Sequence, residues 1–439
     1  MILASRSYRE AKTLDPETAL RGVFAEATSH IAGNGALSAS SRYSWYRAVW
    51  YRDNSMGVIA LTEYSRFFRD RDPAEAANAR KNAAKLLKFL WTTTGKYRSN
   101  MQRALEMDPN SDQFRFLKNH VPARVDKRHG GYFETVRNGS YYTDAIEHEA
   151  DSWLRQHDSM PLLVTATARF VEAFGASSLG LDVLAEISRT LPVAISYMVK
   201  TYNTPSANAW ELEQGRLHAY TVAANSIGLR HAKTLATSLG VKYDGTLGDL
   251  DLKADEIDIF LERTFIRNGI IFRAVDLSGN GKPYSDPVPE PDAAMMLIFN
   301  LGKPRITDRV NVESNTIAFM KSNLNGNHPM LRRWPTDVYF DGGPWYLLGL
   351  AQAAYEVRRG ALGQATERIS YADRRMSRSG EFVLPEQENM HVANRNEDPD
   401  KYLKANDGLP IQALRWSQWE YIRARIALED ALSSLERPS

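Results

Sequence analysis

The stretch PWYLLGLAQAAYEVRR, residues 344–359, has the apolar spacing of a helix that is buried on most of its surface. Trp345 stands at its start, directly after Gly343 and Pro344, where a buried aromatic anchor would begin such a helix. A second stretch with the same richness in Ala, Leu and aromatic residues covers 411–433. The two stretches predict core helices and therefore an α-helical fold.

Other helices are predicted by the residues at their starts. Asp15 and Asp72 each precede a proline, an arrangement in which the acid caps a helix and the proline takes its first position. The helix that begins after Asp72 is expected to end near Gly95. Helical spacing predicts further helices at 160–174, 180–199, 217–239, 252–264, 292–299 and 307–322.

Long connections separate these helices and hold much of the Gly, Pro, Asn and aromatic content. Connections of this kind on a regular helical scaffold usually carry a functional site. About a dozen helices without a linker-like break favour one all-α domain over residues 1–439, and helical hairpins closed into a toroid would suit it. The long connections are 101–150, 200–216, 265–291, 323–343 and 377–410.

Composition excludes several functional classes. The hydrophobic fraction is 43% and the charged fraction 25%, which is typical of a soluble globular protein. Lys and Arg number 55 against 53 Asp and Glu, and no long run of one sign is present, so neither nucleic acid nor a membrane is an expected partner. The absence of Cys excludes disulfides, thiolate metal sites and a cysteine nucleophile.

Five segments combine acidic, basic and aromatic residues at loop or helix-start positions. Trp and Tyr rings stack on the apolar faces of sugars, while Arg and carboxylate groups bind pairs of hydroxyls. Each segment alone has an ordinary structural explanation, such as a surface ion pair for Arg52-Asp53 or a first-turn acid for Glu211. The five segments are 43–53, 153–158, 208–211, 333–345 and 385–387.

The order of the five segments resembles the signature regions of the glucoamylase family, glycoside hydrolase family fifteen. The resemblance covers residues 43 to about 428 and implies an (α/α)6 barrel. It also implies an exo-acting α-glucosidase that takes a small oligosaccharide and releases glucose. The matching stretches are YSWYRAVWYRDNSM (43–56), WLRQHDSMPLLVTA (153–166), NAWELEQGRLHAYT (208–221), RRWPTDVYFDGGPWYLLGLAQAAYE (332–356), LPEQENM (384–390) and LRWSQWEYIRARIAL (414–428).

Carried over position by position, the resemblance implies Glu211 as general acid and Glu386 as general base of an inverting hydrolysis. It implies Arg52, Asp53 and Arg333 as ligands of the terminal glucose. Two carboxyl groups suffice for this mechanism, so we expect no metal and no cofactor. The residues implied to line or support the site are Tyr46, Trp50, Trp153, Trp210, Asp337, Trp345 and Trp416.

Two departures from the family bear on the substrate. Starch-acting members commonly have a second acidic residue after the catalytic acid, where this chain has Leu212. We also expect neither an N-terminal β-sandwich nor a starch-binding domain. Both points favour short maltooligosaccharides or isomaltose-type substrates over starch. A trehalose-cleaving member of the family remains an alternative, as does a silent sugar-binding barrel like that of phosphorylase kinase α subunits.

Three remaining patterns are better explained without a function. The calcium-loop start at Asp276 has Pro287 where a bidentate Glu would be needed, so a turn is expected. No pair of His residues has a zinc-site spacing. The apolar run before Arg6 is too short for a secretory signal, which favours a cytoplasmic protein, although a removed leader would leave the same pattern.

Overall fold

The structure is a computed structural model. It describes residues 14–40, 42, 46, 48–108, 111, 124–125, 134–136, 140–142, 156–213, 215–243, 248–277, 286–337, 339–388 and 411–436.

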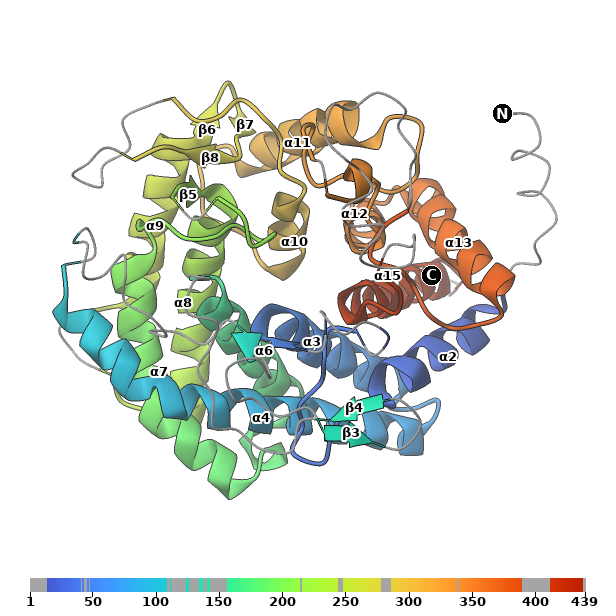
Figure 1. Cartoon of the computed structure of the whole chain (residues 1–439), viewed down its shortest axis with the longest axis horizontal. Coiled ribbons are helices and arrows are strands. Elements are labelled where there is room, and N and C mark those ends of the chain that lie inside the picture. Colours follow the sequence, from blue (N-terminus) through green and yellow to red (C-terminus); the bar gives the residue numbers. More distant parts are fainter. Residues whose placement is uncertain are drawn as a thin grey trace.

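Six helices form a closed inner ring (Figure 1). Each packs against the next one along the chain, and the last returns to pack against the first. These helices are buried nearly all round, as the pattern at 344–359 predicts; in α12 every residue from Tyr346 to Glu356 is buried. The inner helices are α3 (Tyr51–Phe68), α6 (Ser159–Phe174), α8 (Ala219–Leu239), α10 (Ala294–Leu301), α12 (Tyr346–Arg358) and α15 (Arg415–Leu435).

Six further helices lie outside this ring (Figure 1). Inner and outer helices alternate along the described residues, which is the arrangement of an (α/α)6 barrel. The predicted all-α toroid is therefore confirmed. The outer helices are α2 (Pro16–Thr28), α4 (Pro73–Glu106), α7 (Leu181–Thr201), α9 (Leu250–Phe265), α11 (Arg309–Met320) and α13 (Leu362–Ser379).

The predicted starts at Asp15 and Asp72 are confirmed. The Asp15 carboxylate accepts the Thr18 N–H, and the Asp72 carboxylate accepts the Glu75 N–H. The predicted end at Gly95 is wrong, because α4 continues to Glu106. The Glu186 carboxylate of α7 occupies the space beside Gly95, with Oε1 2.2 Å from the position of a Cβ at this residue. Gly95 therefore lies inside α4, next to α7, and does not end the helix.

Helix α13 was not predicted. Its buried face consists of a few residues between charged ones, among them Ala365, Ile369, Ala372 and Met376. A helix of the outer layer needs only this narrow apolar stripe, so its composition is close to that of a polar loop.

The strands are short and lie in the connections. The four pairs among the described residues are antiparallel, and β1 and β5 each lead directly into an inner helix. The pairs are β1 (Val49–Trp50) with β2 (Arg124–Val125), β3 (Glu134–Val136) with β4 (Ser140–Tyr142), β5 (Leu217–His218) with β8 (Ala274–Val275), and β6 (Ile266–Arg267) with β7 (Ile270–Ile271). Short helical turns are η3 (Ala176–Ser178), η5 (Lys321–Asn325) and η6 (Tyr339–Gly342).

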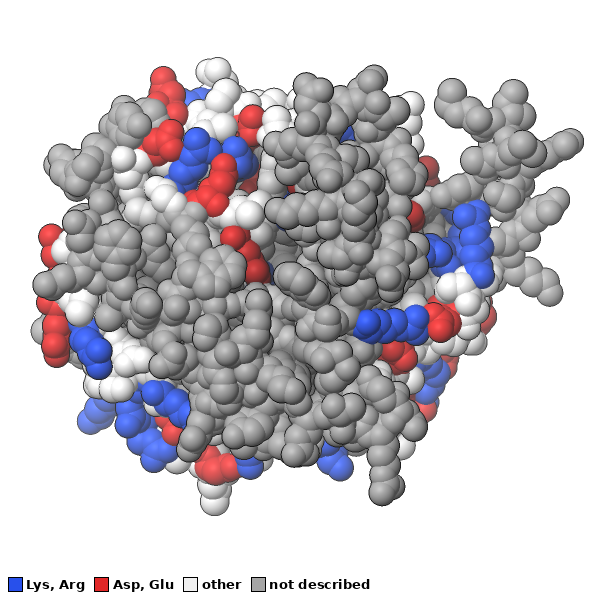
Figure 2. Space-filling model, viewed as in Figure 1, with Lys and Arg blue, Asp and Glu red and all other residues white. Residues whose placement is uncertain are grey.

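One large cluster contains nearly all buried apolar side chains of the described residues. The expectation of a single domain agrees with this cluster but stays a prediction. Acidic and basic side chains are interspersed over the described part of one face (Figure 2). Within the described ranges, no helix is both long enough and apolar enough to cross a membrane.

Candidate active site

The candidate site lies where the inner helices begin. Arg52 in the first turn of α3 pairs with Asp158 just before α6, at 3.0 Å between Nη1 and Oδ2. The same guanidinium lies 5.3 Å from the ring centre of Trp416, in the first turn of α15. Trp345 precedes α12 and packs against Trp210 at 5.5 Å between ring centres. The amino ends of the inner helices therefore meet on one side of the barrel.

Glu211 lies in a tight turn between α7 and β5. The Asn208 side-chain oxygen accepts the N–H groups of Trp210 at 2.9 Å and Leu212 at 3.0 Å. Glu211 and Glu213 have φ values of 66° and 55°, a conformation that residues other than glycine rarely adopt. The indole N–H of Trp210 donates to the buried Asp292 carboxylate at 2.9 Å. Side-chain hydrogen bonds of Asn208 and Trp210 therefore stabilise the backbone conformation of this turn.

The Glu211 carboxylate lies at the edge of the site, with 24% of its side chain exposed. Its Oε1 accepts the indole N–H of Trp50. Arg52 Nη2 lies 3.5 Å from the same oxygen. Both donors thus approach one carboxyl oxygen and leave the other oxygen for a different partner.

Asp53 follows Arg52 and is buried. Burial raises the pKa of Asp53 to about 7, against the opposing effect of the Arg52 cation; the charge of Glu211 raises it further. The charge of Asp53 in turn contributes to a raised pKa of Glu386. Asp53 is therefore electrostatically coupled to both glutamates.

Glu386 is buried on an extended segment that lies between the backbone at Ile411 and the backbone at Tyr346. Its N–H donates to the Ile411 carbonyl at 2.7 Å, and its carbonyl accepts the Tyr346 N–H at 3.1 Å. The Tyr46 hydroxyl donates to Oε1 at 2.9 Å and lies 2.6 Å from the Tyr339 hydroxyl. Oε2 is buried and has no hydrogen-bond partner among the described residues. Burial raises the pKa of Glu386 to about 8, while the Tyr46 hydroxyl and the Arg333 cation oppose that shift.

Arg333 is buried in an aromatic box and paired with Asp337. Its Nε and Nη2 donate to the two Asp337 carboxylate oxygens at 2.7 and 2.6 Å. This bidentate pair fixes the plane of the guanidinium. Its central carbon lies 4.5 Å from the ring centre of Trp334, 4.7 Å from Trp345, 4.9 Å from Tyr339 and 5.7 Å from Trp210.

The predicted site residues within the described part of the chain lie in this one region. Trp153 lies outside the described residues. Tyr339 and Asp292 were not predicted as site residues, because only the fold brings them to Tyr46 and Trp210. The residues brought together are Tyr46, Trp50, Arg52, Asp53, Trp210, Glu211, Arg333, Asp337, Trp345, Glu386 and Trp416.

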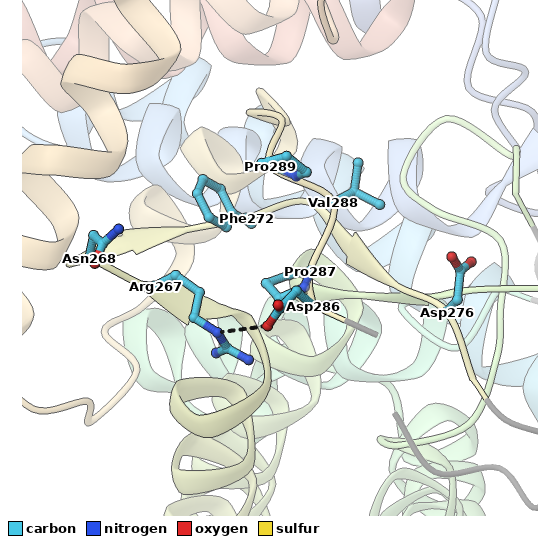
Figure 3. Close-up of a pocket in the computed structure, with 8 residues that line it drawn as sticks. All are labelled: Arg267, Asn268, Phe272, Asp276, Asp286, Pro287, Val288 and Pro289. Atoms are coloured by element: carbon cyan, nitrogen blue, oxygen red, sulfur yellow. Dashed lines mark ion pairs between the residues drawn. The ribbon is translucent and has the colours of Figure 1, made fainter. Parts of the chain in front are cut away.

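An open pocket of about 590 Å³ is lined by the β6–β7 hairpin and residues 286–289 (Figure 3). Arg267 pairs with Asp286 there at 3.5 Å. Asp276, the start of the rejected calcium loop, is also part of this lining and pairs with Arg216 at 2.8 Å. Among the described side chains, no group of three or more His, Asp or Glu is arranged to hold a metal ion.

Comparison with solved structures shows the same fold at low sequence identity. A wild-type glycosidase is 18% identical, with a TM-score of 0.68, over 95% of this chain and 97% of the other. A glycosidase in complex with glucose is 18% identical, with a TM-score of 0.69 and coverage of 94% and 97%. The glucoamylase of Hormoconis resinae is 13% identical, with a TM-score of 0.55 and coverage of 95% and 73%.

Comparison with curated protein sequences gives no match. The family model described as glycosyl hydrolases family 15 matches residues 126–369, more than half of the chain. The resemblance seen in the ordered segments is thereby confirmed, and the chain belongs to family 15 of the glycosyl hydrolases.

Proposed function

We propose that the protein is an inverting, exo-acting α-glucosidase that releases β-glucose from the non-reducing end of short α-glucosides. The observation that carries the proposal is the contrast between the two glutamates. Glu211 lies at the site edge with two donors on one oxygen, whereas Glu386 is buried with one unpartnered oxygen. These two settings suit the two roles that an inverting glycosidase requires.

Glu211 is the proposed general acid. Because Trp50 and Arg52 both approach Oε1, a protonated Glu211 carries its proton on Oε2. That oxygen delivers the proton to the glycosidic oxygen as the bond to the leaving sugar breaks. The partial exposure of Glu211 agrees with a position between the enclosed glucose site and the open leaving-group side.

Glu386 is the proposed general base. The Tyr46 hydroxyl holds Oε1, so the unpartnered Oε2 accepts a proton from the attacking water. The raised pKa makes Glu386 a stronger base once it is ionised. The Tyr46 hydroxyl and the Arg333 cation stabilise the ionised form that this step needs.

The terminal glucose would bind to the charged and aromatic groups between the two glutamates. Arg333 is held in a fixed plane by its bidentate pair with Asp337, and Arg52 is paired with Asp158 through one contact. Asp53, which follows Arg52, offers carboxylate oxygens. The surrounding indole and phenol rings provide stacking surfaces. The solved glycosidase in complex with glucose supports glucose as the ligand of such a site.

Leu212 favours a short leaving group. It directly follows Glu211 and is 44% exposed, so this position presents an alkyl group where a carboxylate could bind a second sugar. With fewer polar contacts beyond the cleaved bond, long glucan chains gain little extra binding. We therefore propose maltooligosaccharides or isomaltose-type glucosides as substrates.

The test compares Glu211→Gln and Glu386→Gln on maltose and on α-glucosyl fluoride. Fluoride departs without protonation, so Glu211→Gln should lose about 10²–10⁴-fold on maltose and far less on the fluoride. Glu386→Gln should lose activity on both substrates, because both need an activated water. Glu17→Gln on the outer helix α2 is the matched control and should resemble the wild type. Near-wild-type hydrolysis of maltose by either site variant would contradict the assigned role.

A further inference from the structure

Each proposed catalytic glutamate has a second glutamate two positions further along the chain. Glu213 follows Glu211, and Glu388 follows Glu386. The second glutamates contact other parts of the fold: Glu213 pairs with Arg273, whose guanidinium lies 5.9 Å from the ring centre of Trp334, and Glu388 contacts outer helix α13. Both proposed catalytic glutamates thus have a neighbouring glutamate, two positions later, that is bound to other parts of the fold.

Glu213 is held by two guanidinium groups. Its Oε2 lies 2.6 Å from Arg273 Nη1, and its Oε1 lies 2.8 Å from Arg216 Nη1. Arg273 is buried and extends the network to Glu290 at 3.1 Å. A ring nitrogen of His218 lies 3.1 Å from the Glu213 carbonyl oxygen. These contacts fix the end of the turn that carries Glu211.

Glu388 is held by two phenol groups. Its Oε1 accepts the hydroxyl of Tyr346, at the start of α12, and that of Tyr371 on α13, the latter at 3.0 Å. Its N–H donates to the Pro344 carbonyl at 2.9 Å. A Cβ at Gly343 would lie 2.0 Å from the Glu388 carbonyl oxygen, so only glycine permits this approach. These contacts hold the extended segment that carries Glu386.

The turn at Glu211 needs such an anchor for a physical reason. Glu211 and Glu213 both have positive φ, a conformation that is strained for residues other than glycine. Without the ion pairs of Glu213, the turn can relax toward an ordinary conformation and displace Glu211. A displacement of about 1 Å at a reacting group can lower turnover by about 100-fold.

We propose that Glu213 and Glu388 are positioning residues, Glu213 for the general acid and Glu388 for the general base. The proposal rests on the proposed function, because it assigns each anchor to the role of its neighbour. The two anchors differ in chemistry. Glu213 acts through its charge on two guanidinium groups, whereas Glu388 needs only an acceptor oxygen for two hydroxyls.

The experiment measures kcat and KM of four variants on maltose and α-glucosyl fluoride. Glu213→Ala should lower kcat on maltose by about 10–100-fold and kcat on the fluoride by less than about 3-fold, since the fluoride needs no acid. Glu213→Gln keeps the shape of the side chain and loses its charge. It should also lower kcat more on maltose than on the fluoride, but by a smaller factor than Glu213→Ala. Glu388→Ala should lower kcat about 10–100-fold on both substrates. Glu388→Gln keeps the acceptor oxygen and should restore activity to within about 3-fold of the wild type.

Matched controls come from anchors of the same chemistry far from the two glutamates. Asp255 on α9 pairs with Arg230 at 2.8 Å and Arg305 at 3.3 Å, as Glu213 pairs with two guanidinium groups. Glu75 on α4 accepts the Tyr64 hydroxyl at 2.8 Å, as Glu388 accepts two hydroxyls. Asp255→Ala and Glu75→Ala should leave kcat on both substrates unchanged.

The substrate split decides the outcome. Equal losses on maltose and fluoride for both Glu213 variants would show a merely structural role and overturn the proposal for the acid. An unchanged kcat in Glu388→Ala, or no recovery in Glu388→Gln, would overturn it for the base. If Glu211→Gln itself shows no split between the substrates, the proposed function fails, and that result is distinguishable from failure of the anchors alone.

Discussion

Replacing Tyr46 by Phe tests the electrostatics of the proposed base. The Tyr46 hydroxyl donates to Glu386 Oε1 at 2.9 Å and so stabilises the ionised carboxylate. A hydrogen bond to a charged group contributes about 1.5–3 kcal/mol, and about 1.4 kcal/mol corresponds to one pKa unit. Tyr339 lies close enough to donate in its place, so the lower end applies. We expect Tyr46→Phe to raise the pKa of Glu386 by about one unit.

The direction in which the pH profile moves follows from the protonation state in which Glu386 is active. The base must be ionised, so kcat/KM rises with pH through the pKa of Glu386, which burial has already raised above its ordinary value. In Tyr46→Phe this acidic limb should move to higher pH by about one unit, with a loss of about 10-fold below it. The charge of Asp53 affects the pKa of Glu386, so the midpoint of the acidic limb is an apparent pKa of the Asp53–Glu386 pair.

The assay is kcat/KM for maltose between pH 4 and pH 9, with Tyr64→Phe as control. Tyr64 also donates to a carboxylate, Glu75, but at the outer layer, so its loss should leave the limb unmoved. An acidic limb that stays in place in Tyr46→Phe, or moves to lower pH, would refute the argument that this hydroxyl stabilises the ionised base.

Three further predictions concern binding and stability. Arg333→Ala should raise the inhibition constant of glucose at least about 10-fold, because the planar guanidinium beside Asp337 is lost; an unchanged constant would remove Arg333 from the glucose site. Asn208→Ala should lower the free energy of unfolding in urea by about 1–3 kcal/mol, since two backbone N–H groups lose their acceptor. A carboxyl whose pKa folding raises stabilises the fold at low pH and loses that contribution as pH rises toward its folded pKa of about 8. Glu386→Gln should therefore stabilise the protein against urea by about 1–3 kcal/mol more at pH 8 than at pH 5, and equal effects at both would contradict the raised pKa.

The helical fold was predictable because its signals are local. An acid before a proline marks a helix start, and the continuous apolar content of 344–359 marks an inner helix. Signals that depend on a neighbour were misjudged or missed. Gly95 was predicted to end its helix, whereas it lies inside α4 beside Glu186 of α7. Helix α13 was missed because most of its surface is polar.

The site was predictable only through the order of its segments. Glu211 and Glu386 lie 175 positions apart in the numbering, and nothing near either one distinguishes it from an ordinary surface acid. The partners of these groups come from other parts of the ring. Tyr339, for example, reaches Tyr46 across 293 positions, and no local pattern encodes that contact.

The central claim is hydrolysis with inversion by Glu211 and Glu386. The most direct measurement is proton NMR of the sugar released in the first minutes of hydrolysis of α-glucosyl fluoride, because its leaving group is fluoride and all the glucose detected comes from the cleaved unit. Attack by a water activated on the far face of the ring predicts that β-glucose appears first and that α-glucose grows in only by mutarotation. α-Glucose as the first product would contradict the assignment of Glu386 as a base that activates water.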